Sequence, residues 1–447
     1  MPLRRALELV QISFRMKIPL QTARARWPFF LAIFLISGGF SFVAGKIWLA
    51  AHWGGSWDQS QLQRAASLEP SNADYWYRLG FLERWNFERG DPRRAVVFYR
   101  RATEANSYSD KSWMDLADAF EALGESDRAG EAFARAQSAH PISPEVAWRY
   151  GNFLLRRGDS PAAFAEIRRA LATDPSLTVQ AVAECSKTSG DLPRILTAIF
   201  PGRSDYYFMA LGYFLSQHQT EAALVTWDQL LGLRQTFEMA NAVPLIDRLI
   251  NQERVEDAVR VWQQALRATS WPHDSAVGSS LVFNGGFEHP LLNGAFDWRE
   301  DPVSGADFSF DSNVVHSGAR SLQVSFDGNA NLDFQNLRQF SPVEPSHRYH
   351  FAAFLRTEGI STDSGIRFAI YDAFHPEVVP MLTSDLVGTH SWSLVETDLL
   401  TGPDTHLLAI SLRRLPSWKF DRNLRGTVWV DDVSLEPASG SARVAPR

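Results

Sequence analysis

Residues 113–141 read WMDLADAFEALGESDRAGEAFARAQSAHP, and residues 147–175 read AWRYGNFLLRRGDSPAAFAEIRRALATDP. Aligned with each other, the two stretches repeat small, bulky apolar, glycine and proline residues every 34 positions, as in Ala129 and Ala163, Phe133 and Ile167, Gly124 and Gly158, and Pro141 and Pro175. A fixed period of this length is typical of stacked helix pairs, which bury their apolar faces against neighbouring pairs. The stretch therefore predicts an α-solenoid, a fold that presents an extended binding surface.

The repeat continues on both sides of this stretch. Upstream, Trp76, Leu79 and Gly80 open another unit, and Gln61–Leu68 is expected to be a lone second helix that begins the stack. Downstream lie a degenerate unit over residues 176–200 and two further units, marked by Trp227 and Trp262. Over residues 57–267 the pattern resembles the tetratricopeptide repeat (TPR) family, most strongly at residues 109–175.

This resemblance implies an inner groove, lined by the first helix of each pair, that binds a peptide or another protein. Side chains on first helices that stand off the packing register are the candidate groove residues. They are Tyr75, Tyr77, Arg78, Asp115, Asp118, Arg149 and Asn152. The alternative is that these polar side chains only solvate the helix faces.

The N-terminus has a different character. Residues 1–26 hold six basic side chains and one acidic one, and Trp27–Gly45 follows with no charged residue. About 20 apolar residues in a helix suffice to cross a bilayer core, and basic flanks stay in the cytoplasm. We therefore expect a cytoplasmic segment at 1–26 and a single transmembrane helix at 27–51, with the rest of the chain outside the cytoplasm. A cleaved signal peptide is the alternative.

Composition excludes some functions. The chain has a formal net charge of −7 although its first 26 residues are basic, so its body is acidic and nucleic acid is not an expected partner. Its single cysteine, Cys185, excludes an internal disulfide framework and a cysteine-based zinc site.

Beyond residue 267 the periodicity changes. Residues 268–280 have the composition of a linker, and residues 438–447 that of a flexible tail. Between them, about eight short segments alternate apolar and polar residues, starting with Leu281–Phe283, and turn residues separate them. Residues 281–437 are therefore predicted to form an all-β jelly-roll sandwich, which makes the fold multidomain: one transmembrane helix, an all-α solenoid and a β-sandwich.

Three motifs refine this prediction: LVFNGGFE at 281–288, HSGARSLQV at 316–324 and VWVDDVSL at 428–435. In this order they resemble the galactose-binding-like jelly rolls of carbohydrate-binding modules. The resemblance implies a structural calcium ion that ties the first strand to the last, with Glu288 and Asp432 as ligands. The alternative is that Glu288 caps a turn and Asp432 ends a strand.

The same resemblance implies glycan binding through exposed aromatic rings. Tyr371, Phe374, Trp418 and Phe420 lie near strand ends or in loops and are the candidates. Trp298, Trp392 and Trp429 occupy positions that usually belong to the core.

The chain carries no motif of a known catalytic site, such as G-x-S-x-G or H-E-x-x-H. The sequence thus predicts a non-catalytic scaffold in the bacterial inner membrane, with its body periplasmic or otherwise extracytoplasmic. The solenoid would bind a protein partner and the sandwich a polysaccharide, in cell-surface polysaccharide assembly or export. The alternatives are an adaptor that binds no sugar and a hydrolase that acts on glycans.

Overall fold

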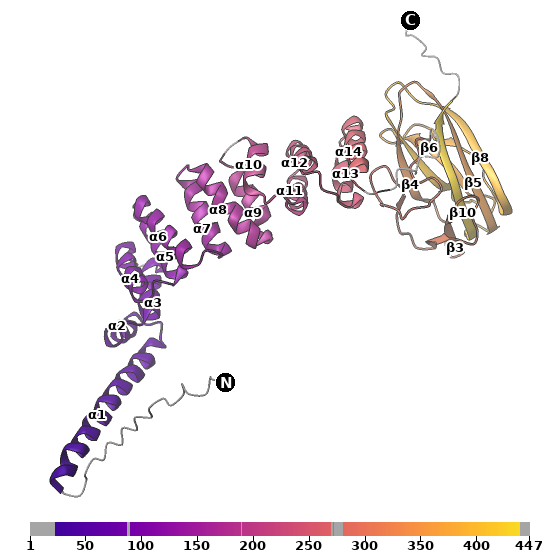
Figure 1. Cartoon of the computed structure of the whole chain (residues 1–447). Coiled ribbons are helices and arrows are strands. Elements are labelled where there is room, and N and C mark those ends of the chain that lie inside the picture. Colours follow the sequence, from indigo (N-terminus) through magenta and orange to yellow (C-terminus); the bar gives the residue numbers. More distant parts are fainter. Residues whose placement is uncertain (1–22, 87–89, 189, 270, 272–279, 439–447) are drawn as a thin grey trace, which may run out of the picture. The chain divides into compact units, whose positions relative to one another are not determined.

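The computed structural model describes residues 23–86, 90–188, 190–269, 271 and 280–438 (Figure 1). Most of the expected N-terminal segment, linker and tail therefore lies outside the described residues. The chain divides into two compact units, one ending at Thr173 and the other beginning at Asp174.

The first unit consists of helices. They are α1 (Ala23–Gly54), α2 (Gln59–Leu68), α3 (Ala73–Trp85), α4 (Pro92–Ala105), α5 (Asp110–Ala122), α6 (Ser126–Ala139), α7 (Pro144–Arg156) and α8 (Ser160–Thr173). As predicted, α2 is a helix over Gln61–Leu68.

Local sequence sets the ends of these helices. The side chains of Ser109 and Ser143, at the same place in successive repeats, accept hydrogen bonds from the first turns of α5 and α7. Gly124 and Gly158, also equivalent, have φ angles of 75° and 80°, which glycine adopts without strain. The 34-residue period therefore repeats the start and the end of each first helix.

Close packing within each pair depends on small residues. A Cβ atom on Gly80 would lie 2.7 Å from the Tyr99 ring, and one on Gly151 would lie 2.8 Å from the Ile167 side chain. The glycines of α3 and α7 thus admit the large residues of α4 and α8.

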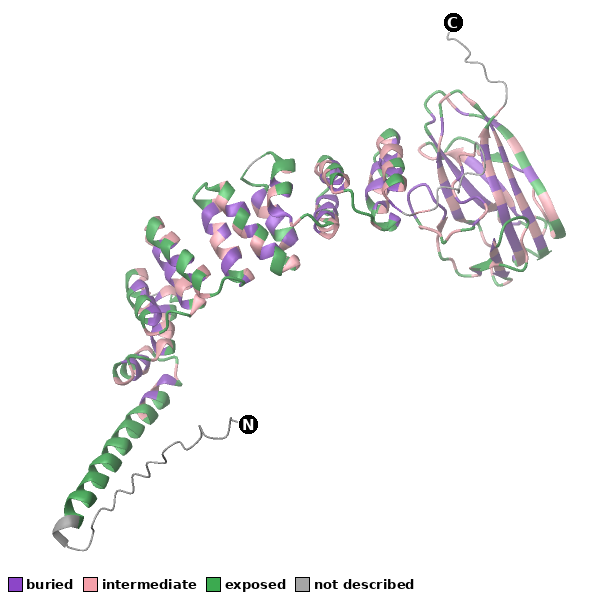
Figure 2. Ribbon diagram, in the orientation of Figure 1, coloured by how far each residue is buried: buried purple, intermediate pink, exposed green. Residues whose placement is uncertain are grey.

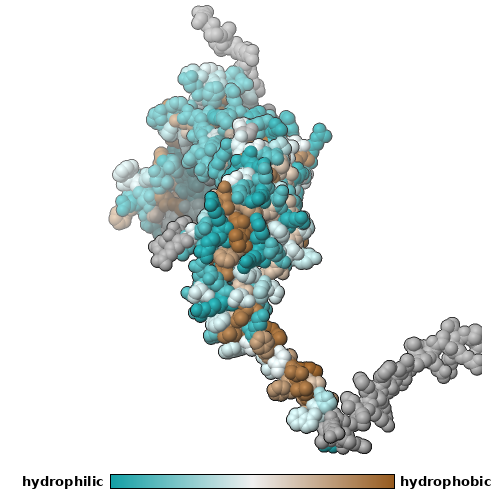
Figure 3. Space-filling model, turned by 90° about the vertical axis from the view of Figure 1, so that its left-hand side faces the viewer, coloured by the Kyte–Doolittle hydropathy of each residue, from teal (hydrophilic) through white to brown (hydrophobic). Residues whose placement is uncertain are grey.

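Helix α1 is exposed along most of its length, as Figure 2 shows, and hydrophobic residues gather along it in Figure 3. In the described part of the chain, its segment Arg26–Gly54 is the one helical stretch long and apolar enough to cross a membrane, judged by length and composition. The helix extends to Gly54, beyond the predicted end at residue 51.

The end of α1 belongs to the core of the first unit. Ala50 is fully buried in a cluster with Leu62, and the Tyr75 ring fills the space where Gly54 lacks a side chain. Arg78 also donates a hydrogen bond of 2.8 Å to the Gly54 carbonyl. The last turns of α1 therefore serve as the first helix of the pair completed by α2.

The second unit begins with helices. They are η1 (Pro175–Leu177), α9 (Thr178–Cys185), α10 (Leu192–Ile199), α11 (Ser204–Ser216), α12 (Thr220–Gly232), η2 (Met239–Asn241), α13 (Val243–Asn251) and α14 (Val255–Ala268). Helices α9 and α10 are short, in agreement with the degenerate unit expected at 176–200.

The remaining regular secondary structure of the second unit consists of strands. They are β1 (Arg299–Glu300), β2 (Ala306–Asp311), β3 (Ser321–Asp327), β4 (Phe334–Pro342), β5 (Arg348–Ile360), β6 (Arg367–Asp372), β7 (Met381–Leu382), β8 (Gly388–Leu400), β9 (Leu407–Arg414) and β10 (Arg425–Pro437).

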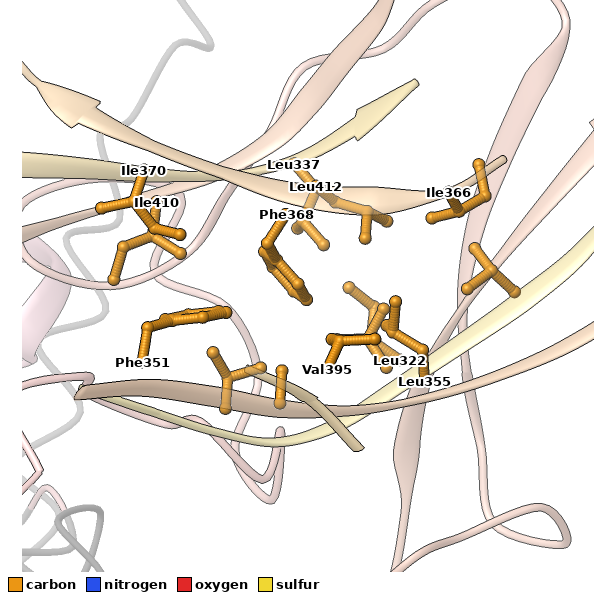
Figure 4. Packing of buried hydrophobic residues seen from close by; sticks show 14 of the residues in the cluster. Leu322, Leu337, Phe351, Leu355, Ile366, Phe368, Ile370, Val395, Ile410 and Leu412 are labelled. Carbon is orange, nitrogen blue, oxygen red and sulfur yellow. The ribbon is translucent and has the colours of Figure 1, made fainter. Parts of the chain in front are cut away.

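Among the described residues these strands form two antiparallel five-stranded sheets, with the orders β1-β4-β9-β6-β7 and β2-β3-β10-β5-β8. We call the second one the β5 sheet. Inward side chains of the two sheets point toward one another in Figure 4, where Phe368, Ile370 and Ile410 face Phe351. The predicted two-sheet sandwich is therefore confirmed.

The prediction of a strand at Leu281–Phe283 was wrong. The backbone of this segment is hydrogen-bonded without forming a strand. The Leu281 N–H donates to the Leu435 carbonyl. The side-chain amide of buried Gln339 accepts the N–H of Phe283 and donates to its carbonyl. A side-chain amide thus replaces a neighbouring strand, which alternation in sequence does not reveal.

Candidate partner groove and carbohydrate face

Three first helices of the first unit carry one connected polar network. The Tyr77 hydroxyl of α3 donates to Asp115 of α5 at 2.7 Å. Arg149 of α7 donates to Asp115 at 2.7 Å and to Asp118 at 2.6 Å. The structure therefore joins four of the predicted groove residues across successive repeats.

The network is half-buried, which strengthens it relative to a solvent-exposed ion pair. Burial alone would lower the pKa of the Arg149 guanidinium, but the attraction of Asp118 and Asp115 outweighs it and raises that pKa. The network thus fixes the spacing of the first helices, and partner contacts would come from its exposed edges.

The other predicted groove residues have different positions. Tyr75 is buried, with 7% of its surface exposed, so it belongs to the core and is not available to a partner. Asn152 donates to the Trp148 carbonyl on its own helix. Arg78 reaches the end of α1 instead of the network.

Sequence reasoning missed an aromatic cluster beside the network. The rings of Trp57 and Phe81 are 5.8 Å apart and those of Phe81 and Trp85 are 6.3 Å apart. Their exposed fractions are 55%, 36% and 51%. Arg78 lies over Trp57 and Arg84 over Trp85, at 5.4 and 5.2 Å from the ring centres.

This cluster lies on the same face of the first helices as the polar network. Arg78, Phe81 and Trp85 share one face of α3 because they are three and four residues apart. Asp115 in α5 and Arg149 in α7 occupy the repeat position of Arg78. Asp118 in α5 and Asn152 in α7 occupy the repeat position of Phe81. We call these residues and Trp57 the groove face. The signal in the sequence was two aromatic residues off the packing register.

In the sandwich, three carboxylates hold the loop of residues 316–320. Glu288 accepts from the N–H of Ala319 at 2.8 Å, and buried Asp431 accepts from that of His316 at 2.8 Å. Asp432 contacts the His316 ring at 2.6 Å and accepts from the Ser317 hydroxyl at 2.7 Å. The first, middle and last motifs therefore meet at this loop.

The predicted calcium ligands Glu288 and Asp432 both belong to this arrangement. Their oxygens face N–H and O–H donors, whereas calcium needs six or more oxygen ligands with free lone pairs. In the described residues, no group of three His, Cys, Asp or Glu side chains is placed to hold a metal ion. The residues present therefore do not fit the ion, and calcium binding stays a prediction.

The outer face of the β5 sheet combines aromatic and polar side chains. The His316 ring stacks on Phe354 at 3.6 Å and meets Trp392 at 5.6 Å. The guanidinium of Arg356, in β5, lies over the ring of Trp429 in the neighbouring strand β10, 5.6 Å from the ring centre. Trp392 is half-exposed although its motif position suggested the core, whereas Trp298 and Trp429 are buried as expected.

A cavity of about 390 Å³ adjoins this face. Its walls include Phe354, Asp432, Ser434 and Glu436. Carboxylate and hydroxyl groups beside an aromatic ring are the groups that hold small polar ligands such as sugars.

The predicted glycan residues do not form a common site. Tyr371 is the last residue but one of β6 and Phe374 follows the strand, whereas Trp418 and Phe420 follow the C-terminal end of β9. Because β6 and β9 are antiparallel, the two pairs lie at opposite ends of the sandwich. Trp418 and Phe420 are 99% and 104% exposed, and Tyr371 and Phe374 are half-buried.

Comparison with known proteins agrees with these observations. The tetratricopeptide repeat family matches residues 86–144 and 114–177. No curated protein matches the chain.

Several solved structures are similar in fold. YrrB, a TPR protein with an unusual peptide-binding site, is 19% identical over 38% of this chain and 91% of its own, with a TM-score of 0.27. A CBM4 structure is 14% identical over 35% and 99%, with a TM-score of 0.26. A family 16 carbohydrate-binding module is 16% identical over 35% and 98%, with a TM-score of 0.25. Residues 86–177 of this chain therefore carry tetratricopeptide repeats, and its C-terminal part is a two-sheet antiparallel β-sandwich.

Proposed function

We propose that the protein is a membrane-anchored, non-catalytic scaffold of the bacterial cell envelope. Helix α1 anchors it in the inner membrane, the groove face holds a protein partner, and the sandwich holds a glycan outside the cytoplasm. Assembly or export of a cell-surface polysaccharide is the process that would need both contacts.

The observation that carries this proposal is the groove face. Three exposed aromatic rings, flanked by arginines, lie next to a rigid network on the first helices of successive repeats. Tryptophan, tyrosine and arginine dominate the energetics of protein interfaces, and exposed aromatic patches mark interaction sites.

Site-specific photo-crosslinking in cells tests the proposal. A photoreactive phenylalanine analogue at Phe81 is expected to capture one defined protein. The same analogue at Val97, which is 52% exposed on the second helix α4, is the matched control and should not capture it. Equal capture at both positions would contradict the proposed groove.

Glycan binding is proposed for the outer face of the β5 sheet, with Trp392 as the stacking ring and Arg356 as a polar contact. Residues 174–447 form one compact unit and are suited to affinity electrophoresis in polysaccharide gels. Retardation should be lost in Trp392→Ala and kept in Trp418→Ala, another exposed tryptophan. No retardation would favour the pure adaptor, and glycan turnover would favour the hydrolase.

The membrane anchor is supported by the exposed surface of α1 and by its end. Cleavage after Gly45 or Ala51, as in a signal peptide, would cut within the helix whose residue Ala50 is buried against α2. The intact mass of the purified protein should therefore include residues 27–51. An alkaline phosphatase fusion after residue 60 should be active, and an inactive one would reverse the orientation.

A further inference from the structure

The cavity of about 390 Å³ beside the outer face of the β5 sheet borders a low place on the sheet surface. Ser434 of β10 lines the cavity and pairs with Ala352 of β5, which in turn pairs with Glu396 of β8. Because successive outward side chains are two residues apart, Ala352 stands between the larger His350 and Phe354 on this face. We call the place over Ala352 the depression.

Carboxylates surround the depression on both sides. Glu436 and Asp432 line the cavity on the side of β10, and Glu396 and Asp398 point outward from β8. The described lining of the cavity includes no basic side chain. The guanidinium of Arg348, exposed at the start of β5, is the nearby permanent positive charge on these strands.

Histidine side chains balance these charges only in part. The ring nitrogens of His350 lie 2.8 Å from Asp398 and 3.4 Å from Glu396. One imidazole carries at most one positive charge against these two carboxylates, which remain 81% and 54% exposed. The side chain of Glu436 forms no ion pair or hydrogen bond with any described residue. The depression therefore keeps an excess of negative charge.

The rest of the outer face has the same sign of charge. Its carboxylates outnumber its guanidinium groups, with Asp307, Asp311, Asp327 and Glu358 against Arg356 and Arg425. A surface of one sign attracts ligands of the opposite sign and repels those of its own. A polyanionic glycan is therefore disfavoured on this face, and a glycan with positive charges is favoured.

The stacking ring and the depression lie along the same strand. Trp392, which meets the His316 ring, and Glu396 are four residues apart on β8, or about 13 Å along a strand. Leu394 stands between them and is 47% exposed. A sugar chain that follows β8 can therefore place one ring on Trp392 and a neighbouring unit over the depression.

We propose that the glycan of this face is a polymer of amino sugars whose amino groups are free and positively charged. The inference rests on the proposed glycan binding and adds the class of sugar. The ammonium groups donate charge-assisted hydrogen bonds to Glu436 on one side of Ala352 and to Glu396 on the other. An N-acetylated sugar has no such charge, and it would cover these carboxylates without pairing them.

Titration calorimetry of the full chain in a neutral detergent at pH 6 tests this assignment. The probes are β-1,4- and β-1,6-linked hexamers of glucosamine and the same hexamers after N-acetylation. At this pH the free amino groups and the exposed carboxylates are both charged. We expect a Kd at least about tenfold lower for a glucosamine hexamer than for its N-acetylated form, which is the factor that one hydrogen bond to a charged group contributes.

Two double variants locate the binding. Glu396→Gln/Glu436→Gln should raise the Kd of the glucosamine hexamer by at least about tenfold and leave that of the N-acetylated form unchanged. The matched control, Glu104→Gln/Glu131→Gln, removes two exposed carboxylates from α4 and α6 and should bind as the parent does. Both variants should keep the melting temperature of the parent, because none of the four side chains is buried.

Equal affinity for free and N-acetylated hexamers would overturn the class of sugar and leave glycan binding in place. An equal loss of affinity in both double variants would also overturn it, since the charge of the whole chain would then hold the hexamer. If no hexamer binds but polysaccharide gels retard the sandwich, the amino-sugar class is wrong. If neither is observed, glycan binding itself is contradicted.

Discussion

The guanidinium of Arg299, in β1, lies 2.6 Å from the carboxylate of Asp247, in α13. The same carboxylate accepts the N–H of Ala295 at 2.7 Å. Around it, the Trp262 ring of α14 packs edge-on against Phe283 and Phe296, at 5.0 and 5.8 Å. Within the second unit, the last helix pair and the sandwich are therefore one packed body, although a linker-like sequence connects them.

Replacement of Asp247 should uncouple the unfolding of the last helix pair from that of the sandwich. Because the Arg299 side chain is only 12% exposed, Asp247→Ala leaves a buried cation without its partner. We expect a loss of about 3 kcal/mol in the free energy of unfolding of residues 174–447, by the usual cost of breaking a buried ion pair. Calorimetry should then resolve two transitions where the parent unit shows one.

The control for that experiment is Asp228→Ala. Asp228 pairs with Arg260 at 3.6 Å and is 57% exposed, so its loss should cost less than about 0.5 kcal/mol. If both variants unfold in one transition at the parent temperature, the junction is not a structural contact.

Tyr99→Phe should stabilise the first unit. The Tyr99 ring fills the space over Gly80, but its hydroxyl is buried without a hydrogen-bond partner among the described residues. Removing an unsatisfied polar group at constant shape should raise the free energy of unfolding by about 1 kcal/mol. Urea unfolding of the full chain in detergent, followed by helical circular dichroism, measures the change.

Tyr77→Phe is the matched comparison, because it removes the hydroxyl that donates to Asp115. It should lower stability by about 1 kcal/mol, which is the usual net value of one hydrogen bond. A Tyr99→Phe variant that is also less stable would show that this hydroxyl has a partner in solution.

The sequence predicted the fold better than the sites. The period through Gly124 and Gly158 specifies backbone turns and packing, which depend on residues close in sequence. The contacts of Gln339 with Phe283 and of Asp247 with Arg299 join distant segments through single side chains, and no local pattern encodes them.

The sites show the same limit. Asp115 and Arg149 were predicted for the groove because they stand off the packing register, and the structure joins them. Phe81 and Trp85 could be found from their spacing on one helix, whereas Trp57 comes near Phe81 only after α2 and α3 fold and could not be predicted as part of the cluster. Glu288 and Asp432 stay predicted calcium ligands, and their contacts with Ala319 and Ser317 belong to a loop whose course the sequence does not specify.

The stability of the second unit should depend on pH through Asp297. Its carboxyl is fully buried, and burial raises its pKa to about 7, although it accepts the N–H groups of Leu292 and Trp298. Between about pH 4 and pH 7 the folded state keeps a proton that the unfolded state has lost. This group's contribution is therefore fully present below about pH 4, is lost progressively as the pH rises to about 7, and does not change further above that pH.

Denaturant unfolding of residues 174–447 at pH 5 to 8 measures this effect. Up to about 1.4 kcal/mol per pH unit is expected from one such group. Asp297→Asn should remove that part of the slope. Asp311→Asn should not, because hydrogen bonds from the Asn313 N–H and the Trp429 ring hold the pKa of Asp311 below its usual range. An identical slope in parent and Asp297→Asn would contradict the assignment.

Calcium addition separates the two roles considered for Glu288. If its carboxylate holds the 316–320 loop through the N–H of Ala319, then calcium should leave the melting temperature of residues 174–447 unchanged. Glu288→Gln should lower stability by about 1–2 kcal/mol, because a charged acceptor is lost. A rise of several degrees with calcium, reversed by a chelator, would instead support the ion.

Protein binding by the groove face is best tested by measuring the affinity for the partner captured at Phe81. Titration calorimetry with the purified full chain should show at least about a 30-fold weaker Kd for Phe81→Ala/Trp85→Ala, since hot-spot residues contribute 2 kcal/mol or more. Val97→Ala should bind as the parent does. An unchanged Kd in the double variant would mean that the groove face does not bind this protein.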